Sequence, residues 1–191
     1  TNRSTYKSAS AGTTIADADI LAFYVWIPRY KYKVWNINKV IGTDSYNAQT
    51  TGIDIVFENG TSSTGTISCT YSYAAPSSSA GSPNETCTGS NGDYYTHPAF
   101  TFGNQELTGF WAGKFELSSE TPSVSGGGGI STTLTPRILP NVISWRANYL
   151  TSFWKVIYDM QTSSNIYGLP TSRTNTDSHM LTNMEWGAVA Y

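Results

Sequence analysis

The stretch that decides the fold is ILAFYVWIPRYKYKVW, residues 20–35. In its first half Phe23, Val25 and Ile27 occupy alternate positions, and after Pro28 the run alternates basic with apolar residues. A period of two is typical of a β-strand that buries one of its faces. We therefore expect two strands here, separated by the proline.

The basic side of the second strand is formed by Arg29, Lys31 and Lys33. It is either a binding stripe or a solvated face that also keeps a sheet edge from pairing. The second interpretation is favoured, because exposed strands commonly carry charged side chains for this purpose. The aromatic residues of the same run, Tyr30, Tyr32 and Trp35, are the candidate binding or assembly residues.

Further strands are expected at 53–57, 66–73, 100–102 and 107–117. The first of these alternates apolar residues and ends at Asn59-Gly60, which is a strong turn signal. The last contains Phe110, Trp111 and Phe115, three large side chains that we expect to lie in the core.

Two amphipathic helices are expected towards the end of the sequence. The first covers 145–160, with Ser144 capping its first turn. Its apolar face is formed by Trp145, Tyr149, Leu150, Phe153, Trp154, Ile157 and Met160. These side chains either form a sugar-stacking surface or bury the helix against a sheet, and burial is the favoured interpretation.

The second helix begins at Thr182, which stands three residues before Glu185 as in a capping box. Its apolar face is formed by Trp186, Val189 and Ala190. The sequence ends at Tyr191, about two turns into this helix. We therefore expect the domain to be incomplete at its C-terminus.

Charge is sparse in this chain. Of the 191 residues 13% are charged, about half the usual share of a soluble domain. Ser and Thr together make up about a quarter of the sequence, and the 14% of aromatic residues supply apolar surface for a core. The net charge of −2 argues against a nucleic-acid partner, and no apolar run approaches the length of a membrane span.

Two cysteines, Cys69 and Cys87, flank a hydroxyl-rich stretch that has no Lys or Arg. In an exported protein such a pair forms one disulfide, here closing a loop over 74–93 and worth ~3 kcal/mol. Two unpaired thiols are the alternative. Together with the composition, the cysteine pair favours an extracellular location, and the start at Thr1 without a leader suggests a processed product.

Asn59 and Asn84 each begin an Asn-x-Ser/Thr triplet, as Asn2 does, and are candidate glycosylation sites. Such triplets arise by chance in a chain this rich in Ser and Thr. O-linked glycans on the hydroxyl-rich loops are therefore an equally good interpretation.

No catalytic, metal or cofactor site is predicted. His97 and His179 lack a second ligand at metal-binding spacing, and Asp17 with Asp19 is a weak pattern for calcium. The carboxylates in apolar surroundings, Glu58, Glu106, Glu116 and Glu185, are not paired by anything in the sequence. We expect His97, which precedes Pro98, to lie in a turn or at the start of a strand, and His179 to cap or hydrogen-bond locally. We expect no enzyme.

Three segments together carry a resemblance to a known family. They are YVWIPR at 24–29, ELTGFWAGKFE at 106–116 and HMLTNMEWGA at 179–188. They resemble, in the same order, motifs of the formylglycine-generating, sulfatase-modifying-factor-like branch of the C-type-lectin fold, which occurs in bacterial and prophage surface proteins. The resemblance implies an α+β fold with a C-type-lectin-like mixed sheet and two helices. The family's catalytic cysteines follow the Glu-Trp helix, where this chain has none, so the resemblance implies a non-catalytic member.

The expected organisation is an extended N-terminal arm over 1–19 and a C-type-lectin-like domain over 20–191, with a Gly/Ser-rich connector at 118–131. The leading functional hypothesis is a non-enzymatic extracellular surface protein that assembles with copies of itself, by arm or strand exchange, into an appendage or filament. The alternative is an adhesin or phage receptor-binding module for a glycan or a host-surface protein. A continuation of the chain beyond Tyr191, or a second chain, would complete the domain.

Overall fold

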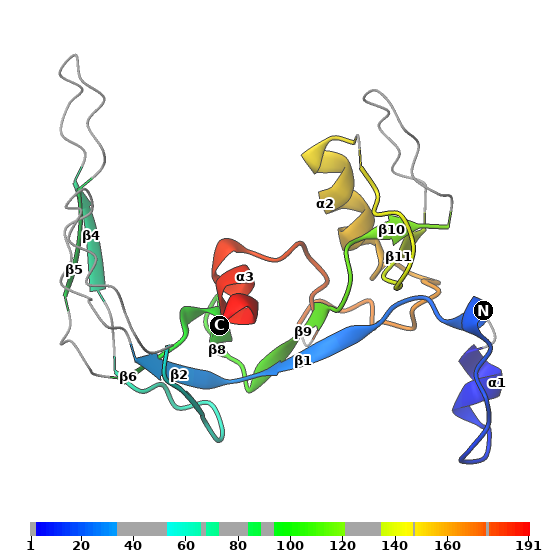
Figure 1. Cartoon of the computed structure of the whole chain (residues 1–191), viewed down its shortest axis with the longest axis horizontal. Coiled ribbons are helices and arrows are strands. Elements are labelled where there is room, and N and C mark those ends of the chain that lie inside the picture. The colour runs from blue at the N-terminus through cyan, green and yellow to red at the C-terminus, as the bar shows by residue number, and fades with distance from the viewer. Residues whose placement is uncertain are drawn as a thin grey trace. The chain divides into compact units, whose positions relative to one another are not determined.

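The computed structural model describes residues 3–33, 53–65, 68–72, 84–88, 94–120, 135–146, 148–174 and 176–191, with side chains in all of them except 68–72 and 84–88. Helices and short strands are mixed in the sequence, so the fold class is α+β, as predicted (Figure 1). The helices are α1 (Arg3–Lys7), α2 (Leu150–Asp159) and α3 (Asn183–Ala190), with 3-10 turns η1 (Asp17–Asp19) and η2 (Pro98–Phe100). The strands are β1 (Tyr24–Pro28), β2 (Tyr30–Lys33), β3 (Ile55–Phe57), β4 (Ser68–Ser72), β5 (Asn84–Thr88), β6 (Tyr94–Thr96), β7 (Thr101–Phe102), β8 (Gln105–Glu106), β9 (Gly109–Gly113), β10 (Ser118–Ser119) and β11 (Pro136–Arg137).

The chain divides into two compact units. Unit 1 comprises Thr1–Val25 and Trp111–Thr182, and unit 2 comprises Trp26–Phe110 and Asn183–Tyr191. The predicted boundary after residue 19 stays a prediction. In the part of the chain that the structure describes, no helix is long and apolar enough to cross a membrane.

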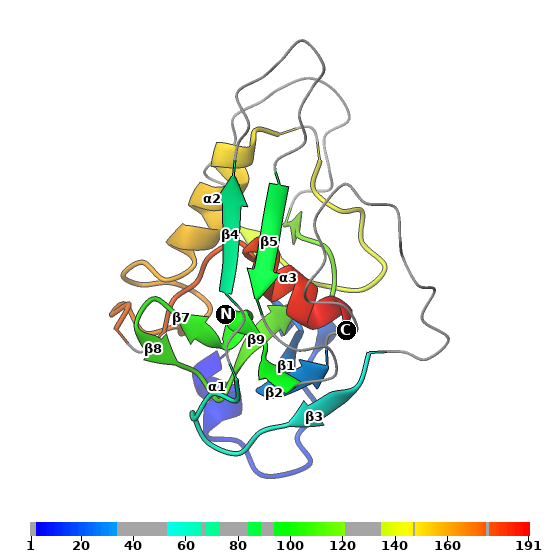
Figure 2. The same cartoon turned by 90° about the vertical axis from the view of Figure 1, so that its left-hand side faces the viewer.

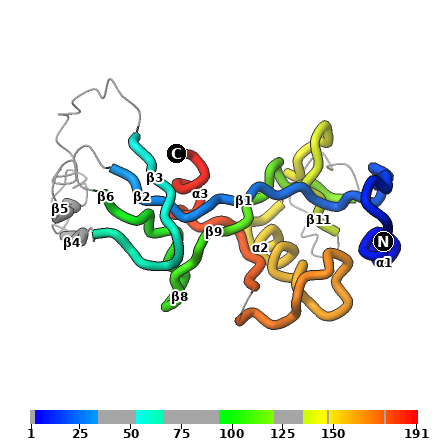
Figure 3. Tube along the Cα trace, turned by 90° about the horizontal axis from the view of Figure 1, so that it is seen from below, coloured from blue at the N-terminus to red at the C-terminus, as the bar shows by residue number. Residues whose placement is uncertain are grey.

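Unit 2 contains a three-stranded antiparallel sheet in the order β3-β2-β6 (Figure 3). In the middle strand Lys31 stands opposite Val56 on one side and Thr96 on the other. The core beside the sheet consists of Tyr30, Ala99, Phe100 and Ala188, with Ile27, Tyr32, Ile55 and Phe110 packed against it. Its members come from β2, η2 and α3, so the C-terminal helix closes this unit.

A second hairpin of unit 2 is formed by β4 and β5, which lie side by side (Figure 2). Its second strand falls inside 74–93, where the sequence predicted only loop, and Asn84 is its first residue. β5 directly follows a Ser-, Gly- and Pro-rich stretch, and its own sequence, NETCT, has no clear alternation of apolar and polar residues. The sequence pattern therefore did not predict this strand.

Unit 1 has buried apolar side chains of its own, namely Ala112, Ile138, Trp145, Val156 and Met160. Ile138 is joined to the segment before β1, because its carbonyl accepts from the amide of Phe23 over 2.9 Å and Ala22 bridges it in parallel. The first residues of the predicted connector, Ser118–Ser119, form β10 and pair with β11, and 121–131 lie outside the described residues.

The sequence predicted an extended N-terminal arm over 1–19, but these residues are not extended throughout. Residues 3–7 form α1 and 17–19 form η1. The two elements are tied together by Tyr6, whose hydroxyl donates to the Asp19 carboxylate over 2.8 Å. A hydrogen bond across thirteen residues folds this segment back on itself.

The first predicted helix is shorter than expected and turned differently. It begins after Tyr149, which makes no side-chain cap, so the prediction of Ser144 as the cap was wrong. Ser152, Val156 and Met160, spaced four residues apart, are buried, whereas Leu150 is 70% exposed and Trp154 50% exposed. The small and aliphatic stripe is buried, and an aromatic stripe is left outside.

The same inversion occurs at two other predicted core positions. In α3, which forms where it was predicted, Glu185 and Ala188 face inward and Trp186 is 64% exposed. In β9, Ala112 is buried and its neighbour Trp111 is 64% exposed. Because consecutive strand residues point to opposite faces, only one of these two could be buried.

Candidate functional site

Arg29 lies between β1 and β2, immediately after Pro28. Its amide donates to the carbonyl of Thr108 over 2.8 Å, and its carbonyl accepts from the amide of Glu58 over 3.0 Å. The side chain is completely buried. The prediction that Arg29 belongs to a solvated basic face was therefore wrong, because acceptors from distant segments surround its guanidinium group.

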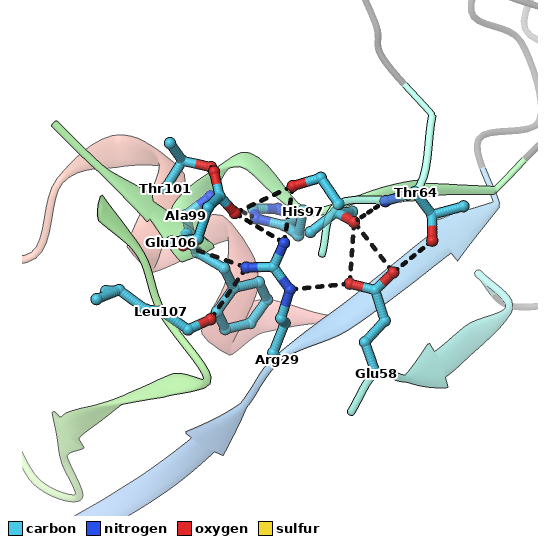
Figure 4. A network of polar contacts seen from close by, with 11 residues as sticks. Arg29, Glu58, Thr64, His97, Ala99, Thr101, Glu106 and Leu107 are labelled. Atoms are coloured by element: carbon cyan, nitrogen blue, oxygen red, sulfur yellow. Dashed lines mark hydrogen bonds and ion pairs between the residues drawn. The ribbon is translucent and has the colours of Figure 1, made fainter. Parts of the chain in front are cut away.

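The guanidinium group of Arg29 has a full set of acceptors (Figure 4). Nε donates to Glu58 Oε2 over 3.1 Å, and Nη2 donates to Glu106 Oε2 over 2.8 Å. Nη1 donates to the carbonyl of Leu107 over 3.0 Å, and Nη2 also donates to Ser63 Oγ over 2.8 Å. A buried arginine is tolerated because carboxylates and carbonyls together satisfy its donors.

The two carboxylates are occupied as well. Glu58 accepts from the Thr64 hydroxyl over 2.6 Å and from the Thr96 hydroxyl over 2.9 Å. Glu106 accepts from Thr101 over 2.7 Å. This hydrogen bond from Thr101, followed by contacts with Arg29, holds the pKa of the Glu106 carboxyl below its usual range. The cluster therefore holds together the segments that carry Arg29, Glu58 and Glu106, and each of these three side chains is engaged in hydrogen bonds.

Sequence reasoning had named Glu58 and Glu106 separately but found nothing that pairs them. Arg29 is the residue that brings them together, from 29 positions before one and 77 before the other. The other two candidate carboxylates, Glu116 and Glu185, are not among the hydrogen-bond partners of Arg29. Only the contact of a buried cation with distant segments reveals the grouping.

His97 is the second buried polar group of unit 2. It is 4% exposed, and its Nδ1 accepts from the amide of Ala99 over 3.2 Å, capping η2. The rings of Tyr30, Tyr32 and Tyr191 have their centroids 5.1 to 5.6 Å from the imidazole. Burial lowers the pKa of His97 to about 4. The imidazole is thus neutral near pH 7, and His97 stands at the start of a 3-10 turn, where the sequence predicted a turn or a strand start.

Two of the three predicted binding or assembly residues, Tyr30 and Tyr32, do not lie on an exposed face. Tyr30 is 3% exposed, and its hydroxyl donates to the carbonyl of Ala188 over 3.1 Å. Tyr32 is half-buried and packs on Tyr191 with 5.7 Å between ring centroids. Trp35 lies outside the described residues. Tyr30 and Tyr32 therefore serve the core, because the sheet turns them towards η2 and α3.

One exposed apolar feature of unit 2 is the strand β3, at one edge of its sheet. Phe57 is 70% exposed and Val56 43% exposed. The amide of Lys33 donates to Asp54, and that of Glu58 donates to Arg29, so these two pairs are hydrogen-bonded to β2. Hydrogen-bonded pairs alternate along an antiparallel ladder. It follows that the N–H and C=O groups of Ile55 and Phe57 point away from β2, towards the edge.

The opposite edge of this sheet is covered. In β6 the outward amide of Thr96 donates to the carbonyl of Thr64 over 2.9 Å, and the Thr64 amide donates to the Thr96 hydroxyl over 2.7 Å. No described residue makes a corresponding hydrogen bond to the outer side of Ile55 or Phe57. Within the described residues β3 is therefore the open edge of this sheet, and we take it as the candidate functional site.

The remaining sequence candidates are placed as follows. The backbone register of β4 and β5 sets Cys69 opposite Cys87, while the side chains of both cysteines and of Asn84 lie outside the described part. Asn59 is exposed in the turn after β3. His179 lies 2.9 Å from the Asp177 carboxylate, a local contact of the kind predicted. The described residues contain no group of three or more His, Cys, Asp and Glu that could hold a metal ion.

Comparison with known proteins gives no relative: no family model, no curated protein and no solved structure matches the chain. The resemblance to the sulfatase-modifying-factor-like branch therefore stays a prediction from three sequence segments. The function has to be argued from the geometry of the candidate site itself.

Proposed function

We propose that this protein is a non-enzymatic subunit of an extracellular appendage or filament, in which a strand from a second copy adds to the open edge of β3. The observation that carries the proposal is the edge itself. Its outward N–H and C=O groups belong to Ile55 and Phe57, and Phe57 is 70% exposed. An unpaired apolar edge strand is a ready template for another strand.

The composition of β3 favours an edge that pairs with another strand over an edge that stays exposed to solvent. Natural proteins protect free edges with Lys, Pro or bulges, whereas β3 is Ile-Val-Phe. The low charge of the chain, 13% of residues with a net charge of −2, leaves little repulsion between copies. A strand contact between unlike surfaces builds a filament when its rotation does not close into a ring.

The extracellular part of the proposal is supported by the cysteine pair. Directly opposite residues of an antiparallel ladder have Cα atoms about 4.5 to 5.5 Å apart, which lies within the range that disulfides require. The register sets Cys69 opposite Cys87. A disulfide across β4 and β5 would suit an oxidising compartment. We also propose that the chain forms a C-type-lectin-like domain of a surface protein.

Sedimentation velocity over a range of concentrations tests the assembly. The wild type should form larger species as its concentration rises, and Phe57→Lys should weaken association by about tenfold or more, because it places a charge at the edge. Trp186→Lys is the matched control, since Trp186 is 64% exposed in the same unit but lies on α3. A monomeric wild type at every concentration, or a Phe57→Lys protein that assembles normally, would contradict the proposal.

One observation favours the alternative of a glycan-binding adhesin. On the outer stripe of α2 the rings of Trp154 and Tyr158 stack with centroids 4.9 Å apart, and the Arg173 guanidinium lies 3.4 Å above the Tyr158 ring. Half of Trp154 is exposed. Rigid aromatic faces of this kind are good anchors for a ligand.

A glycan array distinguishes this second function. Binding that is lost in Trp154→Ala but kept in Trp111→Ala would support it, because Trp111 is also largely exposed but lies outside the stack. An array without hits, or hits that survive Trp154→Ala, would exclude recognition through this surface.

A further inference from the structure

Unit 1 contains a pocket of about 330 Å³ that neither proposed function uses. It lies among α1, the residues before β1 and the segment that follows α2, and Figure 3 shows this last segment beside α1. The volume falls at the lower end of the range for small-molecule sites. Such a pocket suits a small ligand.

Most of the lining is aliphatic. The aliphatic side chains are Ile15, Ile20, Leu21, Ala22, Ile166 and Leu169. Five polar side chains complete the wall, namely Arg3, Tyr6, Asp19, Tyr24 and Tyr167. An apolar cavity with a few polar groups is the usual design of a site that orients a ligand through one end.

Two of the polar groups are already held by the protein. The Tyr6 hydroxyl donates to the Asp19 carboxylate over 2.8 Å and accepts from the amide of Ala16 over 3.2 Å. The Tyr167 hydroxyl donates to the carbonyl of Pro136 over 2.7 Å. The Asp19 charge is thereby partly satisfied, and these groups form the fixed part of the wall.

Arg3 is different, because it makes no hydrogen bond or ion pair with a described residue. Arg3 is exposed, and its guanidinium group lies against Gly168. That glycine has a φ of +69°, and a Cβ built on it would overlap Nη1 and Cζ of Arg3. Because residue 168 is a glycine, the space that a Cβ would fill is occupied by the guanidinium group of Arg3.

We propose that this pocket binds a medium-chain monocarboxylic acid, with the hydrocarbon stem against the aliphatic lining and the carboxylate on Arg3. A guanidinium matches a carboxylate with two parallel hydrogen bonds. A cationic ligand is disfavoured, because it would meet Arg3 while Tyr6 holds Asp19. The site lies wholly in unit 1, so the inference does not depend on assembly through β3 in unit 2.

Isothermal titration with n-octanoate tests the proposal, with n-octanol and n-octylamine as probes of equal stem length. The wild type should bind octanoate saturably and more tightly than octanol, and should not bind octylamine. Arg3→Gln should weaken octanoate by about tenfold or more, since a hydrogen-bonded charge is lost, and leave octanol unchanged. Lys7→Gln is the matched control, because Lys7 also lies on α1 but does not line the pocket.

Arg3→Lys separates charge from folding, and it should retain more octanoate affinity than Arg3→Gln at an unchanged circular dichroism spectrum. The same affinity in the Phe57→Lys background would show that the pocket acts independently of assembly. The proposal is overturned if the folded wild type does not bind octanoate, if octanol binds as tightly as octanoate, or if Arg3→Gln binds octanoate like the wild type.

Discussion

Glu58→Gln is the substitution that tests the buried arginine cluster most sharply. It preserves the shape of the side chain but leaves Arg29, which is completely buried, without its partner at 3.1 Å. Breaking a buried ion pair on one side costs roughly 3 to 5 kcal/mol. Because Glu106 still contacts Arg29 at 2.8 Å, we expect a loss of about 3 kcal/mol, at the lower end of that range.

Glu106→Gln supplies the internal comparison. The Glu106 side chain is 33% exposed, against 7% for Glu58. Water screens the more exposed charge, so its removal should cost about 1 kcal/mol. Asp159→Asn is the surface control, because its ion pair with Lys155 joins two side chains that are 32% and 51% exposed. It should cost less than about 0.5 kcal/mol.

Amide hydrogen exchange measures the effects of Glu58→Gln and Glu106→Gln inside unit 2, whereas Asp159→Asn, which lies in unit 1, should leave the amides of unit 2 unchanged. The amides of Arg29 and His97 donate to the carbonyls of Thr108 and Tyr30, so they report opening around the cluster. Glu58→Gln should speed their exchange far more than Glu106→Gln. A Glu58→Gln protein within about 0.5 kcal/mol of the wild type, or one less affected than Glu106→Gln, would refute the assignment of the cluster as a buried anchor.

Three further outcomes are expected. Because burial lowers the pKa of His97 from 6.5 to about 4, the unfolded chain binds a proton first as the pH falls, and stability should drop by about 3 kcal/mol between these values. Urea unfolding should show this loss in the wild type and less of it in His97→Asn, which keeps a capping acceptor. Gly109→Ala should destabilise unit 2 by ~2 kcal/mol or more, since its Cβ would come within 2.5 Å of the Ile27 carbonyl oxygen. The Cβ of Gly103→Ala meets nothing within 4 Å, so this substitution should cost about 1 kcal/mol by backbone strain alone. Thermal unfolding of the two variants measures the difference. The intact mass should be that of the bare 20.8 kDa chain less two hydrogens if Cys69 and Cys87 are joined and no glycan is attached.

The sequence predicted the strands and the helices where the local pattern was strong. The alternation after Pro28 correctly located β2, and Asn59-Gly60 marked the end of β3. Spacing also located α3, because Thr182 and Glu185 bracket its first turn. These features are set by neighbouring residues, which is why they can be predicted without tertiary contacts.

Which face each element buries was predicted less well. Trp111 was expected inside because of its size and Trp154 because it lies on the apolar face of the predicted helix, yet each is at least half exposed. Their smaller neighbours Ala112 and Val156 are buried instead. Local periodicity shows that one face is apolar, but only the other elements decide which side is covered.

The candidate site depended on contacts between distant residues. Nothing in the sequence distinguishes Arg29 from Lys31, although the first is buried between two carboxylates and the second lies in the middle of a sheet. The open edge at Ile55 and Phe57 likewise follows only from the strand order, because an edge is a property of the sheet. Residues that gain their role through a long-range partner have no local signal.

The most direct test of the assembly account is amide exchange at Ile55 and Phe57, followed residue by residue in dilute and in concentrated protein. In one chain these amides have no acceptor among the described residues, whereas the Thr96 amide donates to Thr64 and serves as the internal reference. The account predicts fast exchange of both β3 amides in dilute protein and strong protection in concentrated protein, with Thr96 protected in both. Equal exchange of Ile55 and Phe57 at all concentrations would contradict it.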